Sequence, residues 1–284
     1  MNSKETLIND FKNLGLQEGD VVFIRGNLGK VGRVKPRELF LDALFEAIGY
    51  SGTIVTLGFT KSFPFYKVDK KYIFEQNTIP ETGAFGKLCL QYKNSKRSNH
   101  PTNSFIAIGK YADDILKDHD ENAMLYDPTK KLIELNAKMI IFGIIDESPG
   151  FTTVHYVQQE LGLTEQSFFQ NLFRVYYKDK NDNLKLFKKS DVGGCSAGFG
   201  KFYPHYLSNG FLKTGQIGNS SAILINAKDA YAIEYRLMKD NNSFHFCDNP
   251  LCVSCRLSWK YDLKYALNYL ILKVISLFKR KKLI

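Results

Sequence analysis

The sequence predicts an α/β fold: a central, mostly parallel sheet flanked by helices, then an added β-rich C-terminal portion and a C-terminal amphipathic helix. The order of apolar and helix-like segments leads to this prediction. Short apolar runs alternate with helix-like segments through the first half of the chain. Strands buried on both faces read as continuous apolar runs, and parallel strands need connections long enough to hold a helix.

The first half of the chain supplies the predicted sheet and its helices. Leu7, Phe11 and Leu14 recur at helical spacing and predict a short first helix. A second helix is expected over 35–49, because Pro36 suits its first turn and Gly49 its end. Further helices are expected at 110–119 and 130–136, and buried strands at 20–24, 52–59, 104–109 and 138–144.

The second half changes character. Two β-like runs within 172–190 are separated by an Asn/Asp-rich turn, which predicts a hairpin. A helix ending at Gly210, strand and turn segments over 214–229, and an amphipathic helix over 227–240 are expected next. We divide the chain into an α/β region (residues 1–165), a hairpin and helix portion completing the same domain (residues 166–243), and a C-terminal region (residues 244–284). The boundary near 165 is weak.

Charge is concentrated at one end of the chain. The net charge is +10, and residues 256–284 carry eight Lys/Arg and one acid. A nucleic-acid binder needs a basic face on its folded body, so we predict no nucleic-acid partner. The N-terminal residues lack the apolar region of a signal peptide, and the five cysteines form no complete set of pairs. Together these features predict a cytoplasmic protein with reduced thiols.

Two Gly-rich segments are candidate phosphate-binding loops. The run 195–202 fails, because Cys195 replaces the first glycine and Phe202 replaces the hydroxyl residue that binds Mg²⁺. The turn 26–32 follows a strand and is flanked by Arg25, Lys30 and Arg33. Its backbone N–H groups suit an anionic ligand such as a pyrophosphate, although an ordinary turn is the alternative.

Two polar segments carry candidate functional side chains. The loop 96–104 holds Arg97, Ser98, His100 and Ser104 between a helix and a strand, where ligand-binding residues tend to collect. A solvated loop with local hydrogen bonds is the alternative. The segment 150–162 contains His155, which is either a general base or a hydrogen-bonded core histidine. His119 and His205 are interpreted as structural.

Several segments, taken together and in order, resemble the aminoglycoside 3-N-acetyltransferase family. They include "LGLQEGDVVFIRGNLGKVG", "TGAFGKL", "RSNHPTNSFIAIGKYADDILKDH" and "TTVHYV", and they extend over roughly residues 14–160. The resemblance implies that acetyl-CoA is a co-substrate and that an amine of a sugar is the acceptor. It also implies that residues 1–165 contain the acyl-CoA-binding and catalytic segments.

The resemblance implies roles for individual residues. His155 is the expected catalytic base. The tetrahedral intermediate also needs donors to its oxyanion, for which Thr152, Thr153 or backbone N–H groups near them are candidates, and we select Thr152. We expect coenzyme contacts from Arg25, Asn27, Leu28, Lys30, Gly32, Arg97, Ser98 and Thr153. We expect acceptor contacts from His100, Ser104, Lys87 and Gln158.

Two departures from the family pattern affect the expected acceptor. A glutamate is usual where Lys87 and Gln158 stand. The loss of these acids favours a negatively charged acceptor, such as a nucleotide-linked amino sugar used in surface polysaccharide synthesis. The alternatives are an antibiotic-modifying acetyltransferase and a non-catalytic binding protein of the same fold. His155 also lacks its usual carboxylate, for which Asp146, Glu147 or Glu160 are candidate substitutes.

The C-terminal region raises two separate questions. His245, Cys247, Cys252 and Cys255 are of the types that bind zinc, but we predict a turn of reduced thiols and keep zinc as the alternative. Cys89 and Cys195 are interpreted as ordinary thiols. Residues 256–284 read as a basic amphipathic helix. It either lies peripherally on the inner membrane surface or packs on the protein or a second copy, and the oligomeric state stays open.

Overall fold

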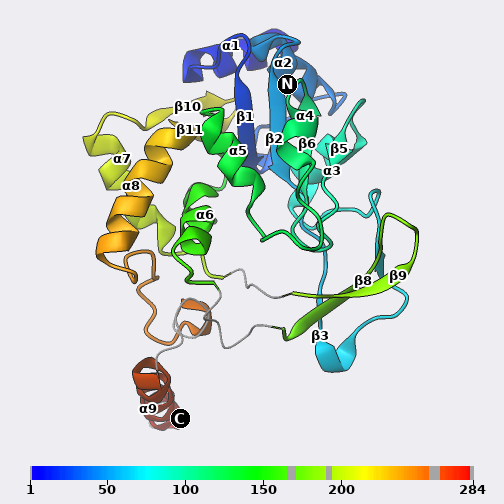
Figure 1. The fold of residues 1–284 in the computed structure, drawn as a ribbon. Helices are drawn as coiled ribbons and strands as arrows, with labels where there is room; N and C mark the ends of the chain where they lie inside the picture. Colours follow the sequence, from blue (N-terminus) through cyan, green and yellow to red (C-terminus); the bar gives the residue numbers. More distant parts are fainter. Residues whose placement is uncertain (1, 165–170, 190–193, 256–262, 282–284) are drawn as a thin grey trace.

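The computed structural model describes residues 2–164, 171–189, 194–255 and 263–281. A seven-stranded sheet in the order β10-β11-β7-β1-β2-β6-β5 forms the centre of the molecule (Figure 1). Its strands are β1 (Val21–Gly26), β2 (Thr53–Leu57), β5 (Lys96–Arg97), β6 (Phe105–Gly109), β7 (Lys138–Phe142), β10 (Lys213–Ile217) and β11 (Ser220–Asn226).

The α/β class is confirmed, but the sheet is mixed rather than mostly parallel. The pairs β7–β1 and β1–β2 are parallel, whereas β6 runs antiparallel to β2 and β11 antiparallel to β7. The expectation of a mostly parallel sheet is therefore corrected. The physical reason is that β6 and β11 are also covered on both faces, and burial on two faces gives the same continuous apolar run in either strand direction.

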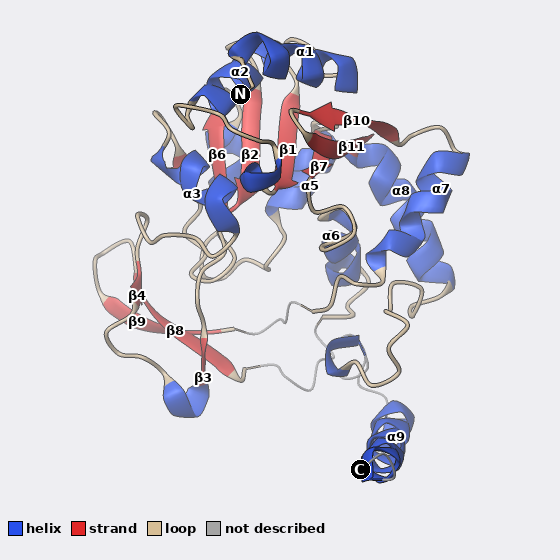
Figure 2. Ribbon diagram, turned by 180° about the vertical axis from the view of Figure 1, so that it is seen from behind, coloured by secondary structure: helices blue, strands red, loops and turns tan. Residues whose placement is uncertain are grey.

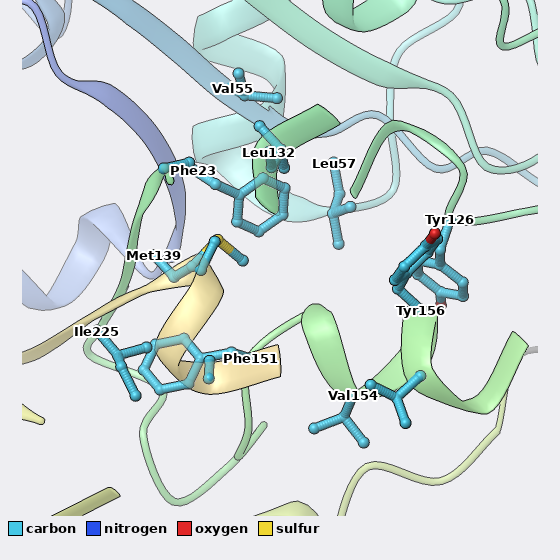
Figure 3. Packing of buried hydrophobic residues seen from close by; sticks show 14 of the residues in the cluster. Phe23, Val55, Leu57, Tyr126, Leu132, Met139, Phe151, Val154, Tyr156 and Ile225 are labelled. Carbon is cyan, nitrogen blue, oxygen red and sulfur yellow. The ribbon is translucent and has the colours of Figure 1, made fainter. Parts of the chain in front are cut away.

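Helices cover both faces of the sheet, as the continuous apolar strands require. Val22 and Ile24 of β1 pack into one core, and Val21 and Phe23 pack into the other. The first core is covered by α1 (Lys4–Leu14), α2 (Leu39–Ile48) and α3 (Gly83–Gln91). The second is covered by α4 (Ala112–Leu116), α5 (Pro128–Glu134), α6 (Thr153–Glu160), α7 (Tyr203–Ser208) and α8 (Ala227–Asp240). Figure 3 shows several side chains of this second core.

The predicted helices form where their end signals stand. Ser3 Oγ accepts a hydrogen bond from the Thr6 N–H at 3.1 Å and caps the start of α1. Gly15 follows α1 with a φ of 110°, a left-handed conformation that suits glycine. The helix expected over 35–49 begins later than predicted, at Leu39, and ends at Ile48 before Gly49.

A small second sheet lies apart from the central one (Figure 2). The predicted hairpin is confirmed as β8 (Phe173–Lys178) and β9 (Leu184–Lys188). The short strands β3 (Phe63–Pro64) and β4 (Ile73–Phe74) pair with β8. The boundary predicted near residue 165 falls at 165–170, outside the described residues, so the division of the chain stays a prediction.

The C-terminal helix α9 (Leu263–Lys281) exposes apolar side chains, among them Leu267, Leu270 and Ile271. No helix within the described residues is long and apolar enough to cross a membrane. The start of the predicted segment 256–284 lies at 256–262, outside the described residues. Contact of this segment with a membrane surface stays a prediction.

Candidate active site

A cavity of about 840 Å³ lies where β1 and β2 end. Arg25 and Gly26 come from the end of β1, and Thr56 and Leu57 come from the end of β2. In open α/β sheets, ligands bind outside the carboxyl ends of such strands. The start of α3, the loop before β6 and the start of α6 complete the walls, and this last segment brings His155 to the cavity.

His155 is held in one orientation by its neighbours. Its ring stacks on Tyr126 with centroids 4.5 Å apart and meets Phe199 edge-on at 5.0 Å. Its Nδ1 lies 2.8 Å from Oε1 of Gln158, whose side chain is buried. Because an amide oxygen accepts but does not donate, Nδ1 carries the hydrogen and Nε2 carries the lone pair. This tautomer is the one that suits Nε2 to act as a base.

The surroundings of His155 favour its neutral form. Burial lowers the pKa of the ring to about 4, and the positive charge of Arg25 acts in the same direction, against the hydrogen bond to Gln158. The carboxylates of two candidate partners are engaged elsewhere. Glu160 accepts from the Tyr231 hydroxyl, and Glu147 pairs with Lys30. The partner of Nδ1 is therefore the neutral amide of Gln158, not Glu147 or Glu160, and support from Asp146 stays a prediction.

Arg25 braces the loop that leads into α6. Its Nη1 donates to the Gly150 carbonyl at 3.0 Å, and its Nη2 donates to Ser148 Oγ at 2.6 Å. The Gly150 N–H donates to the Tyr203 hydroxyl at 2.8 Å. Gly150 has a φ of 83°, and a Cβ there would lie 2.2 Å from a Phe199 carbon, so glycine is required. Arg25 also lines the cavity, and its predicted contact with the coenzyme stays a prediction.

The adjacent threonines Thr152 and Thr153 have different neighbours. Thr152 lines the cavity, is 1% exposed, and its Oγ1 has no hydrogen-bond partner within the described part of the chain. Thr153 Oγ1 donates to Glu234 at 2.8 Å, and that carboxylate also accepts from Tyr206. Burial raises the pKa of Glu234 to about 8. Thr153 therefore ties α6 to α8, and its predicted coenzyme contact is corrected.

Arg97 stabilises the polar loop instead of facing the cavity. It is 8% exposed and donates to the carbonyls of Gly58 and Thr78, and its Nε donates to Ser104 Oγ at 2.7 Å. Ser104 in turn donates to the Gly58 carbonyl at 2.7 Å. Neither Arg97 nor Ser104 lines the cavity. Their predicted ligand contacts are corrected, because backbone carbonyls already use their donors.

His100 and Ser98 belong to the same buried network. His100 Nδ1 accepts from the N–H groups of Thr102 and Asn103, at 3.3 and 3.0 Å. Burial, with His119 nearby, holds the pKa of His100 well below its usual value. Ser98 Oγ lies 2.9 Å from His119 Nδ1. The loop reaches the cavity through Thr102 and Asn103 rather than through the predicted residues, so the contacts expected of His100 and Ser98 are corrected.

The Gly-rich turn reaches the cavity with its first half. Asn27 and Leu28 line the wall, and their contact with the coenzyme stays a prediction. Lys30 does not, because its ammonium group pairs with Glu147 on the surface. Gly32 also lies outside the cavity, where its φ of 96° places it next to Asn219. Coenzyme contacts from Lys30 and Gly32 are therefore not supported.

Two further predicted residues lie away from the cavity, and several unpredicted ones line it. Lys87 is exposed on α3, so its predicted acceptor contact is corrected. Gln158 acts through His155 rather than by lining the cavity itself. Sequence reasoning missed several lining residues, among them Glu81, Tyr126, Lys189, Ser196 and Ser254. The position of Glu81 two residues before "GAFGKL" is the one available signal.

Four cysteine side chains gather next to the cavity. The sulfur atoms of Cys195, Cys247, Cys252 and Cys255 all lie within 4.8 Å of one another. His245 is buried against Phe246 and is not in this group. The predicted set of candidate ligands is corrected accordingly, and Cys195 is no ordinary isolated thiol.

Comparison with known proteins identifies the family. Residues 24–239 match the model of the family described as aminoglycoside 3-N-acetyltransferase. The chain belongs to this family. The resemblance predicted from the sequence is thereby confirmed, and so is the expectation of an acetyl-CoA-dependent N-acetyltransferase, at the level of the family.

Relatives of the aminoglycoside 3-N-acetyltransferase family match over most of the chain. An aminoglycoside N(3)-acetyltransferase III from Salmonella sp is 25% identical over 81% of this chain and 88% of its own length. A mutant of aminoglycoside acetyltransferase AAC(3)-IVa in complex with a gentamicin superposes with a TM-score of 0.76 at 20% identity, covering 91% of this chain and 98% of that one. The structure of AAC-IIIb with CoASH superposes with a TM-score of 0.68 at 18% identity, covering 84% of this chain and 97% of that one. The structural likenesses confirm the fold.

Proposed function

We propose that this chain transfers the acetyl group of acetyl-CoA to the 3-amine of an aminoglycoside. The observation that carries the proposal is His155, anchored through Nδ1 and lining the same cavity as Thr152. The family and its named relatives support the acceptor class. The surface-polysaccharide acceptor expected from the sequence has less support and becomes the second candidate.

The reaction needs one proton acceptor and one oxyanion donor. The amine nitrogen attacks the thioester carbonyl carbon, a C–N bond forms, and the C–S bond then breaks. His155 Nε2 takes the proton that the amine loses during attack and returns it to the leaving CoA sulfur. Proton transfer of this kind contributes about 10²–10⁴-fold in rate. Thr152 Oγ1 donates to the carbonyl oxygen as it gains negative charge.

The charges of the cavity fit two ligands of opposite sign. Arg25 and Lys189 place positive charge on its walls, which suits the anionic coenzyme. Glu81 is the one carboxylate among the described lining residues. Its Oε1 lies 3.5 Å from the ammonium nitrogen of Lys61. We propose that Glu81 binds an ammonium group of the acceptor.

The same charges motivate the second candidate, a nucleotide-linked amino sugar. Among the described lining residues, one carboxylate stands against two cations, which is a weak attraction for a polycationic antibiotic. An acceptor that carries a pyrophosphate would meet less repulsion from Arg25 and Lys189.

A panel of acceptors tests the proposal. CoA release is measured with acetyl-CoA and kanamycin-type aminoglycosides, and in parallel with nucleotide-linked amino sugars. We expect the higher kcat/KM with the aminoglycosides and acetylation at the 3-amine by NMR of the product. Turnover with nucleotide-linked sugars alone would establish the second candidate. Absence of CoA release with every acceptor, despite coenzyme binding, would establish a binding protein.

A charge variant sharpens the acceptor test. Glu81→Gln is expected to raise KM for the aminoglycoside about tenfold, equivalent to about 1.4 kcal/mol, with little change in KM for acetyl-CoA. Lys61→Gln is the matched opposite change: it removes the ammonium group that pairs with Glu81 without altering a lining residue, so it should not raise KM for the aminoglycoside. Equal effects of Glu81→Gln on both substrates would contradict the assigned role.

A further inference from the structure

The four clustered cysteines have the spacing of ligands around one metal ion. The sulfurs of Cys247 and Cys255 are 3.6 Å apart, and all four lie within 4.8 Å of one another. Zinc held tetrahedrally by bonds of about 2.3 Å places its sulfur ligands about 3.8 Å from each other. A disulfide would need two sulfurs at about 2.05 Å. The cluster matches the first arrangement.

We propose that Cys195, Cys247, Cys252 and Cys255 bind a single structural Zn²⁺. Four thiolates fill a tetrahedral shell completely, which is typical of structural rather than catalytic zinc. Backbone donors support the thiolates: the Cys247 N–H points at the sulfur of Cys255, and the Ala197 N–H points at that of Cys195, each at 3.4 Å. Hydrogen bonds made to the ligand atoms by groups outside the metal site orient those ligands.

The zinc joins two distant segments into one wall of the active-site cavity. Cys195 lies far before the Cys-x4-Cys-x2-Cys run of residues 247–255. Its neighbours Gly194 and Ser196 line the cavity, and so does Ser254 between the last two ligands. Lys201 connects the same segments by donating to the Phe246 carbonyl at 2.8 Å. The ion therefore shapes the site without touching the reacting atoms.

Metal analysis of the full chain, purified without a histidine tag, tests the assignment directly. We expect about one zinc per chain, because the four ligands form one closed site. Cys195→Ser is expected to lose most of this zinc. Cys89→Ala is the matched control that keeps it, because Cys89 is buried in the other core, between α3 and the sheet. The measurement uses no substrate, so its outcome is separate from that of the proposed activity.

Two further measurements on the wild-type chain keep the test valid if Cys195→Ser does not fold. Replacement of zinc by Co²⁺ should give the intense absorption of tetrahedral thiolate coordination. Thiol titration after denaturation in a chelator should find all five cysteines reduced. A chain that takes up no stoichiometric metal under reducing conditions, or in which one thiol titrates because two disulfides have formed, would overturn the proposal.

Discussion

The loop that leads into α6 and the loop between β5 and β6 show how similar polar segments acquire different roles. Both contain residues with hydroxyl groups. His155 follows the first loop and His100 lies within the second, and burial lowers the pKa of both histidines. In the first, His155 and Thr152 line the cavity. In the second, His100 accepts from two backbone N–H groups and lies outside the cavity.

The difference lies in whether the histidine of each segment lines the cavity. Thr152 is also a lining residue, and its buried hydroxyl has no hydrogen-bond partner among the described residues. The guanidinium of Arg97 is used by carbonyls and by Ser104. Each segment holds a buried polar atom without a partner among the described residues, His100 Nε2 in one and Thr152 Oγ1 in the other, so the position of the histidine distinguishes them. Variants of the first loop should therefore change kcat, and variants of the second should change the free energy of unfolding.

The largest effect is expected from His155→Ala. Loss of the base should lower kcat by about 10²–10⁴-fold. Binding of acetyl-CoA and the fold should persist, as measured by calorimetry and circular dichroism. His205→Ala changes a histidine outside the cavity and should leave kcat unchanged. Full activity in His155→Ala would contradict the role of His155 as the base.

A threonine pair provides the next largest effect. Thr152→Val should lower kcat by roughly 10²-fold, the lower end of the loss typical for one oxyanion donor. Thr153→Val instead breaks the contact with the buried Glu234, so it should lower the free energy of unfolding by about 1–3 kcal/mol. Steady-state kinetics and urea denaturation of both variants separate the two outcomes. Equal kinetic losses would contradict the separate roles.

His100→Ala should reduce stability more than catalysis. It leaves the N–H groups of Thr102 and Asn103 without their acceptor, at a cost of about 1–3 kcal/mol in the free energy of unfolding. Urea denaturation measures this, with the exposed Lys87→Ala as the control. The kcat per folded molecule should change far less than in His155→Ala. A catalytic loss without destabilisation would assign His100 to the chemistry.

The smallest effect is a shift in pH dependence in Gln158→Glu. His155 is active as a base above its folded pKa of about 4. A carboxylate next to Nδ1 favours the imidazolium, so it raises that pKa by about one unit or more. The acid limb of kcat/KM should therefore move to higher pH, and activity at acidic pH should fall first. Gln158→Met removes the acceptor without adding charge, and an identical shift in both variants would contradict this explanation.

The sequence allowed most elements to be predicted but not the direction of all strands. Val22 and Phe23 lie in opposite cores, and that two-sided burial was readable as an apolar run. Whether 105–109 returns parallel or antiparallel depends on the path of the chain over 58–104. That path is set by tertiary packing, which a local pattern does not encode.

The candidate site was predicted only incompletely. His155 and Thr152 were found through ordered family segments, and both line the cavity. Tyr126 stacks on His155 from a segment without any motif, so nothing local indicated it. Cys195 was missed as a partner of 247–255 because a contact between distant positions leaves no spacing to read. His245 was favoured by proximity along the chain alone.

A structure with CoA and an aminoglycoside bound tests the catalytic role of His155 most directly. We predict that the CoA sulfur enters the cavity where β1 and β2 end. We also predict that the acceptor amine lies within roughly 3 Å of His155 Nε2. A second hollow of about 840 Å³, lined by Phe45, Tyr50 and Tyr92, offers the coenzyme another place on the molecule. Coenzyme bound there, with the amine far from His155, would contradict this role.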